Sequence, residues 1–131
     1  MSQTATADYQ SFYDQFDLAT LDTQFHGDFE TGINACVECC DRYAGDGRIA
    51  LNWDGVDGTS RTVSFDELQR LSARFANLLT TLGIGPGDCV AGLLPRTPDL
   101  FVVVLGTLRA GAVYQPLFTA FGPKALQQRL R

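Results

Sequence analysis

The chain has 131 residues, 45% of them hydrophobic, and fifteen acidic against ten basic side chains give it a formal net charge of −5. This length is enough for one domain with a buried core, and the composition is typical of a globular protein. Because a nucleic-acid backbone is bound by clustered Lys and Arg, which the sequence lacks, we predict no nucleic-acid partner.

The N-terminal part, residues 1–29, is predicted to be a leader followed by a short helix. Its aromatic residues recur at helical spacing, at Tyr9, Phe12, Tyr13 and Phe16, and we interpret them as a face that packs on the domain. The first residues carry neither a basic region nor an apolar core, so we expect no signal peptide. The longest apolar run is also far shorter than the roughly 20 residues of a membrane span. These features predict a soluble, cytoplasmic protein.

Three of the four cysteines fall in a predicted helix over residues 34–43. Cys36, Cys39 and Cys40 share one helical face, Cys89 stands alone in an apolar run, and His26 is the only histidine. A zinc knuckle would need a tight turn and a second pair of ligands. We therefore predict that the cysteines pack as small apolar side chains, with a zinc site as the lesser alternative.

A β-hairpin and a long helix are predicted next. Residues 48–54 alternate apolar and polar side chains, residues 59–63 return, and Asp54-Gly55 or Asp57-Gly58 supplies the turn. Ser64 and Glu67 have the spacing of a capping box, which opens a helix that ends at Gly83. The residues predicted to line its buried face are Leu68, Leu71, Phe75, Leu78 and Leu82.

The segment 87–117 predicts strand, helix, strand. Residues 89–94 form an unbroken apolar run that suits a strand buried on both faces. Thr97 is placed to cap the following helix with its side chain, and Gly111 ends it. We therefore predict an α/β fold: a partial N-terminal subdomain with a parallel strand–helix–strand unit, preceded by a β-hairpin and N-terminal helices. Another helix is expected from Pro123, with Leu126 and Leu130 toward the core, and the pattern stops there as in an incomplete domain.

The order and spacing of several segments resemble the N-terminal region of adenylate-forming acyl-CoA synthetases, the AMP-binding enzymes. The resembling residues are Ser64 to Leu68, Gly87-Asp88-x-Val90, Pro95, Asp99, Gly106, Ala110 to Tyr114, and Phe121-Gly122-Pro123 through to Leu126 and Arg129. The segment 34–43 is similar to an Asn…Cys-x-Asp-Arg signature of the acetyl- and propionyl-CoA synthetase branch. The resemblance implies that residues 30–131 are an incomplete N-terminal α/β portion of an AMP-binding domain.

The resemblance also implies an activity for a longer parent protein. Such a ligase uses ATP and magnesium to activate a carboxylate, here short- or medium-chain, as an acyl-adenylate, and then transfers the acyl group to coenzyme A (CoA). The family's phosphate-binding loop, magnesium-binding acid and catalytic lysine are not in this sequence. We therefore predict no catalytic residue and no metal ligand here, and we expect the segment to be inactive alone, with no cofactor bound. The carboxylate and CoA would be bound through the missing part.

The resemblance places a CoA contact at Ala120 and Phe121, where the related branch has Gly-Gly-Phe and this chain has Thr119-Ala120-Phe121. The alternative is that Phe118 and Phe121 are core residues. Arg96, just beyond the first strand, is either an anion contact or an ordinary loop arginine. Uncovered sheet edges and apolar faces would favour self-association. A non-catalytic α/β binding or association module is the alternative function.

Overall fold

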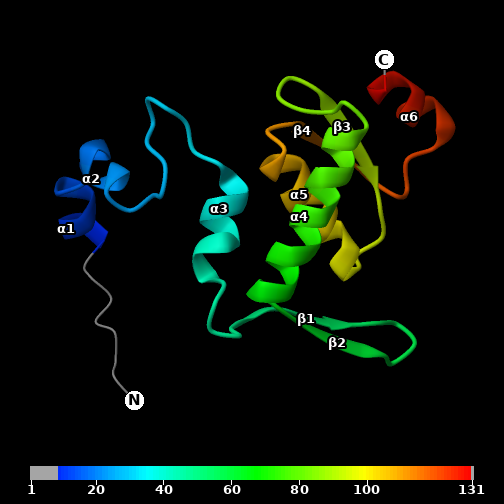
Figure 1. Cartoon of the computed structure of the whole chain (residues 1–131), viewed down its shortest axis with the longest axis horizontal. Helices are drawn as coiled ribbons and strands as arrows, with labels where there is room; N and C mark the ends of the chain where they lie inside the picture. The colour runs from blue at the N-terminus through cyan, green and yellow to red at the C-terminus, as the bar shows by residue number, and fades with distance from the viewer. Residues whose placement is uncertain (1–8, 131) are drawn as a thin grey trace. The chain divides into compact units, whose positions relative to one another are not determined.

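The computed structural model describes residues 9–130 of the chain, and its contacts divide it into two compact units (Figure 1). The first unit ends at Ile33 and the second begins at Asn34. The predicted division after residue 29 stays a prediction.

The first unit contains two short helices, α1 (Tyr9–Asp14) and α2 (Leu18–Asp22). The Asp17 side chain caps α2 by accepting a hydrogen bond from the Ala19 amide. The predicted aromatic face of α1 is present, since the rings of Tyr9 and Tyr13 stack with centroids 6.2 Å apart. The docking of this face on the domain stays a prediction.

The second unit begins with α3 (Ala35–Cys39) and a short 3-10 helix, η1 (Asp41–Tyr43). The single helix predicted over residues 34–43 is therefore interrupted at Cys40. A loop leads from η1 to β1 (Ile49–Asp54), which pairs in antiparallel register with β2 (Ser60–Ser64). This loop is tied to the next helix because the Asp66 carboxylate accepts hydrogen bonds from the amides of Gly45 and Gly47.

The long helix α4 (Phe65–Thr81) starts where the capping box predicts. The Ser64 hydroxyl accepts from the Glu67 amide, whereas the Glu67 carboxylate bonds Arg61 instead of completing the box. The predicted buried face is wrong in part: Leu78 and Leu82 are 51% and 65% exposed. The residues that α4 buries are Leu68, Ser72, Ala76 and Leu79.

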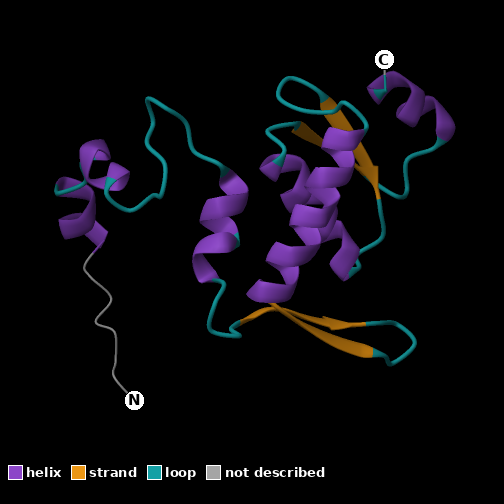
Figure 2. Ribbon diagram, in the orientation of Figure 1, coloured by secondary structure: helices purple, strands orange, loops and turns teal. Residues whose placement is uncertain are grey.

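The predicted strand–helix–strand unit consists of β3 (Cys89–Leu93), α5 (Pro98–Arg109) and β4 (Val113–Leu117). Strands β3 and β4 run parallel and pair from Cys89↔Val113 to Leu93↔Leu117 (Figure 2). Helix α5 lies along α4, and α6 (Pro123–Arg129) closes the described part (Figure 1). The predicted α/β class, with its hairpin and parallel unit, is confirmed.

Two expectations about this unit are wrong. The side chains of β3 alternate between exposed and covered, because among the described residues α5 covers only one face of the pair. Cys89 and Leu93 are consequently exposed rather than buried. Thr97 occupies the N-cap position of α5 without a side-chain capping bond. Outside this unit, Leu130, the C-cap residue that follows α6, is exposed and α6 itself buries no residue, so the prediction that Leu130 faces the core is also wrong.

Helix α5 approaches α4 closely at Gly106. A Cβ atom at this position would lie 2.8 Å from the Ser72 carbonyl oxygen and 2.8 Å from Cδ1 of Phe75. Small residues on both helices, Gly106 on α5 and Ser72 and Ala76 on α4, therefore set the distance between them. No helix in the described range 9–130 has the length and apolar character needed to cross a lipid bilayer.

The core of the second unit contains two of the cysteines. Cys36 and Cys40 are fully buried and pack with Val63, Leu68 and Leu105. The prediction that cysteines pack as apolar side chains is thus confirmed for this pair, but Cys39 and Cys89 are exposed. Burial, reinforced by the neighbouring Cys36 and Asp41, raises the pKa of the Cys40 thiol to about 12. Burial also raises the pKa of Cys36.

We expect the four thiols to react in two classes. Iodoacetamide at pH 8 should modify Cys39 and Cys89 quickly, while Cys36 and Cys40 react only through unfolding, because thiolate is the nucleophile and both buried thiols stay protonated. Intact-mass analysis over time should show two fast adducts, and denaturant should expose all four sites. A third adduct that forms as fast as the first two would show that Cys36 or Cys40 is accessible, which would contradict their burial in the core.

The raised thiol pKa values also predict an alkaline loss of stability. Below pH 9.0, the ordinary thiol value, both folded and unfolded chains hold the Cys40 proton. Above it the unfolded chain releases the proton and the folded chain keeps it up to about pH 12, so the free energy of unfolding falls across that range. Urea unfolding at a series of pH values measures this. A Cys40→Ala chain should show a shallower decline.

Candidate functional site

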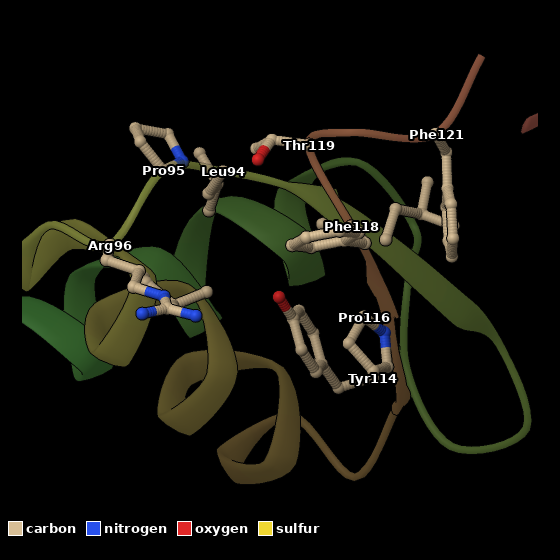
Figure 3. A pocket seen from close by; sticks show the side chains of 11 residues that line it. Leu94, Pro95, Arg96, Tyr114, Pro116, Phe118, Thr119 and Phe121 are labelled. Carbon is tan, nitrogen blue, oxygen red and sulfur yellow. The ribbon is translucent and has the colours of Figure 1, made fainter. Parts of the chain in front are cut away.

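The described structure has a hollow beyond the carboxyl ends of β3 and β4. It has a volume of about 290 Å³ and is lined by Leu94, Pro95 and Arg96, which follow β3, and by Tyr114 and the residues around Phe118 (Figure 3). Gly92 on β3 and Leu100 on α5 also line it. Open α/β sheets place ligands at this end of their strands, where the loops diverge. The hollow is therefore the candidate functional site.

Tyr114 projects from β4 into this hollow. Its hydroxyl is buried and has no hydrogen-bond partner among the described residues. Figure 3 shows the hydroxyl directed into the space between Arg96 and Phe118. A buried hydroxyl without a partner costs stability, so the close packing of this ring is a strained feature of the sheet.

Gly92 on β3 makes room for the Tyr114 ring. A Cβ atom at Gly92 would lie 2.7 Å from Cε2 and 2.8 Å from Cζ of that ring, closer than real side chains approach. Glycine in a strand interior often marks such a close approach. The pair Gly92 and Tyr114 thus decides where the hydroxyl points.

We expect Gly92→Ala to displace the Tyr114 ring and to lower the free energy of unfolding by about 1–3 kcal/mol, as overpacking does. Chemical denaturation measures the loss. Gly85→Ala is the matched control, because a Cβ at Gly85 meets nothing within 4 Å. Equal stability of the two variants would contradict the close packing of Gly92 on Tyr114.

Arg96 supplies the charge of the site. Among the described residues it is the only charged one that lines the hollow, and it is exposed. Its backbone is held by the β-hairpin, since the Trp53 indole donates a hydrogen bond of 2.7 Å to the Arg96 carbonyl oxygen. The side chain makes no ion pair within the described part of the chain. The arrangement offers a guanidinium at the rim of an otherwise apolar hollow.

The residues 118–121 form a tight turn after β4. The Phe121 amide donates to the Phe118 carbonyl oxygen at 2.9 Å, and the two rings pack edge to face with centroids 5.8 Å apart. Both rings line the hollow, while Ala120 lies between them at an exposed position. The alternative that Phe118 is a core residue is wrong, because it is 57% exposed. Phe121 is half-buried, and the Arg129 guanidinium lies 4.2 Å from its ring centroid.

The chemistry of the site limits what it can hold. The hollow offers one cation and aromatic surface, which suit an anionic group joined to an apolar or aromatic body. It has no carboxylate, and no group of three or more His, Cys, Asp or Glu side chains that could hold a metal occurs within residues 9–130. The residues that line the hollow therefore do not fit magnesium–ATP, and no catalytic step is assigned to them.

The segment 34–43 does not line the hollow but binds the carboxyl end of α5. The Asn34 side chain caps α3 through the Cys36 amide, and its own amide donates to the Leu108 carbonyl oxygen at 3.2 Å. Asp41 receives two hydrogen bonds from Arg109, one of them 2.8 Å long. Both ends of the segment therefore bind the carboxyl end of α5, where backbone carbonyls lack helical partners. The Asn…Asp spacing is explained by this clamp, which lies outside the hollow.

Comparisons with known proteins identify the family. Residues 38–131 match the sequence profile described as AMP-binding enzyme, so the chain belongs to the AMP-binding enzyme family. It is 40% identical over 106 residues to the acetyl-coenzyme A synthetase of Cronobacter sakazakii. It is 36% identical over 100 residues to that of Chlorobaculum tepidum. These matches cover 78% and 74% of this chain, and the chain spans 16% and 15% of those two relatives.

A solved structure agrees with the sequence matches. The crystal structure of an acyl-CoA synthetase from Brucella canis superposes with a TM-score of 0.89 and 52% sequence identity, covering 93% of this chain and 22% of that one. The resemblance to adenylate-forming acyl-CoA synthetases is therefore confirmed. The predicted α/β fold matches part of the fold of that enzyme.

From the sequence, Ala120 and Phe121 were predicted as a CoA contact and Arg96 as either an anion contact or an ordinary loop arginine, and the structure brings Arg96 and Phe121 to the same hollow. Sequence reasoning missed Gly92 and Tyr114. A glycine within an otherwise apolar strand was the available signal, since it indicates close approach of a neighbour. The Arg109 partnership with Asp41 was also missed, because the two residues are 68 positions apart.

Proposed function

We propose that the chain forms part of an ATP-dependent acyl-CoA synthetase that activates a short- or medium-chain carboxylate as an acyl-adenylate and transfers the acyl group to CoA. The observation that carries the proposal is the hollow beyond β3 and β4 in a chain 52% identical to a Brucella canis acyl-CoA synthetase. The acetyl-coenzyme A synthetases among its relatives support a short acyl group. ATP, magnesium and the carboxylate would be bound by residues outside this sequence.

The contribution proposed for this chain is a contact with CoA through Ala120 and Phe121. Three features support it. The turn lies beyond the carboxyl end of β4, Ala120 is exposed at its tip, and the Phe121 ring lines the hollow. Aromatic surface and exposed backbone suit the mixed apolar and amide character of the pantetheine arm. The 131-residue chain alone is proposed to be inactive, because adenylation requires the phosphate-binding and metal-binding groups named above.

ATP–pyrophosphate exchange with a panel of carboxylates tests the adenylation step on protein isolated from its native source. Exchange that depends on a short or medium-chain acid is the expected result, and no exchange with any acid would contradict the proposal. The same assay on the 131-residue chain should give none. If the chain is instead a non-catalytic module, it should bind its partner, and neither the native protein nor the 131-residue chain should catalyse ATP–pyrophosphate exchange.

The Phe121→Ala variant of the active protein separates the CoA contact from adenylation. We expect the KM for CoA to rise about tenfold with the loss of a buried aromatic contact, while the exchange rate, which needs no CoA, stays unchanged. Val56→Ala, at the exposed tip of the hairpin, is the control. An unchanged KM for CoA in Phe121→Ala would overturn the assignment of this residue.

We also propose that the isolated chain self-associates through the open side of its small sheet. Leu93 and Val113 on this sheet are 47% and 57% exposed, and Phe118 follows directly after it. Contiguous exposed apolar side chains favour association. Sedimentation velocity at increasing concentration tests this, and a clean monomer at the highest concentration would contradict it.

A further inference from the structure

The two short helices of the first unit carry an exposed aromatic surface that the proposed ligase function does not use. Every residue of α1 is exposed, and the rings of Phe12 and Tyr13 are 62% and 65% exposed. We propose that this surface and the groove beside it bind a basic amphipathic helix of a partner protein. The proposal goes beyond the ligase function and does not depend on it.

The first argument is a groove that can receive an apolar side chain. It has a volume of about 280 Å³ and is formed by α1, α2 and the loop between them. Its apolar lining consists of Phe12, Phe16 and Leu21, and the two phenylalanine rings lie with centroids 6.0 Å apart. Helices that dock in a groove insert apolar anchors into pockets of this kind. A leucine side chain of the partner therefore suits the groove.

Charge is the second argument, and it selects the partner. The first unit, residues 1–33, contains six Asp and Glu and no Lys or Arg, whereas all ten Lys and Arg of the chain follow residue 41. A surface of one sign attracts a partner of the opposite sign and steers its association. The same charge opposes the pairing of two first units and the binding of an anionic membrane surface. A basic polypeptide is the complementary partner.

The third argument is that rings and carboxylates alternate along the same short segment. The rings of Tyr9 and Tyr13 stack on α1, Asp14 follows directly, and Asp17 begins α2. A Lys or Arg side chain can place its charge near a carboxylate while its cationic head and aliphatic stem lie on an aromatic ring. We therefore expect the partner helix to carry Lys or Arg beside leucine-like residues at helical spacing.

Fluorescence anisotropy of a labelled peptide, titrated with the 131-residue chain, tests this surface. One probe is an amphipathic helical peptide of lysine and leucine. The other has glutamine in place of leucine, so that it keeps the charge and loses the apolar face. We expect the lysine–leucine peptide to bind at least about tenfold more tightly, because only its leucines can enter the groove. High salt should weaken the binding of both peptides.

Variants of the chain locate the binding surface. Phe12→Ala should weaken the lysine–leucine peptide about tenfold, as the loss of an aromatic contact at an anchor pocket does. Leu82→Ala on α4, an apolar residue that is 65% exposed, is the matched control and should have no effect. Asp14→Asn should also weaken binding, whereas Asp54→Asn, an exposed carboxylate of the hairpin, should not. Circular dichroism checks that each variant keeps the helix content of the wild type.

Each result supports or overturns the proposed surface. Equal affinity for the two peptides would show a charge effect alone and overturn it, as would unchanged binding by both Phe12→Ala and Phe16→Ala. No binding of either peptide would also overturn it and would favour the packing of α1 on the domain that its residue spacing predicts. If Phe12→Ala instead abolishes a concentration-dependent dimer in sedimentation velocity, a second copy occupies the surface and the partner helix is overturned. ATP–pyrophosphate exchange by the native protein tests the ligase separately.

Discussion

Replacing Arg109 by glutamine should lower the free energy of unfolding of the second unit by about 3 kcal/mol, as expected when one partner of a buried ion pair is removed. The Arg109 and Asp41 side chains are only 22% and 17% exposed, and Arg109 donates two hydrogen bonds to the Asp41 carboxylate. Arg109 also donates to the buried Ser72 hydroxyl at 3.3 Å. Without the guanidinium, the Asp41 charge stays close to the core without a counter-charge, and the clamp that holds α3 and η1 on α5 loosens.

A double-mutant cycle separates this pair from general damage. Asp41→Asn alone should be similarly destabilising, because it leaves the Arg109 charge unpaired. The double variant should lose clearly less than the sum of the two single losses, since it leaves no unpaired charge. Chemical denaturation monitored by circular dichroism gives the four free energies. Simple additivity would show that the two side chains do not depend on each other.

Replacing Gly106 by alanine is expected to destabilise the second unit by about 2 kcal/mol, although alanine is ordinarily the better helix former by about 1 kcal/mol. The substitution is expected to destabilise, despite the better helix propensity of alanine, because the new methyl group would lie 2.8 Å from the Ser72 carbonyl oxygen. A backbone oxygen cannot rotate away as a side chain can. The two helices would therefore have to move apart, which weakens the packing of α4 on α5.

Gly85→Ala is the control for this prediction. A Cβ at Gly85 meets nothing within 4 Å, and its φ lies outside the left-handed region. Thermal unfolding should show a clear loss for Gly106→Ala and little change for Gly85→Ala. A more stable Gly106→Ala variant would mean that helix propensity outweighs the contact and that the interhelical distance is not fixed at this position.

Patterns among residues close in sequence predicted most of the helices and strands. Ser64 begins α4 through its own hydroxyl, and Gly83 and Gly111 end α4 and α5 with positive φ values of 78° and 74°. These features involve residues close in sequence, so a pattern along the chain identifies them. The parallel pairing of β3 with β4 followed from two apolar strands joined by one helix.

The errors came from contacts between distant residues. The buried face of α4 was predicted from its leucines, but the helix instead buries Ser72 and Ala76, because α5 approaches closely only where side chains are small. Contacts between distant residues are also the reason why part of the candidate site was not predicted. Gly92 within its strand indicates that a neighbour approaches closely, but nothing local indicates that this neighbour is the Tyr114 ring of the adjacent strand. Resemblance pointed to the turn at Ala120 and Phe121, and the end of the first strand pointed to Arg96, whereas only the three-dimensional arrangement adds Tyr114.

The intact mass of the protein isolated from its native source tests the central claim, that this chain is part of a larger acyl-CoA ligase. Its relatives are about six times longer than the matched segment, since that segment covers 16% of their length. We expect a mass far above the 14.3 kDa of the 131 residues. A mass equal to that of this chain would contradict the proposed ligase and favour a binding or association module.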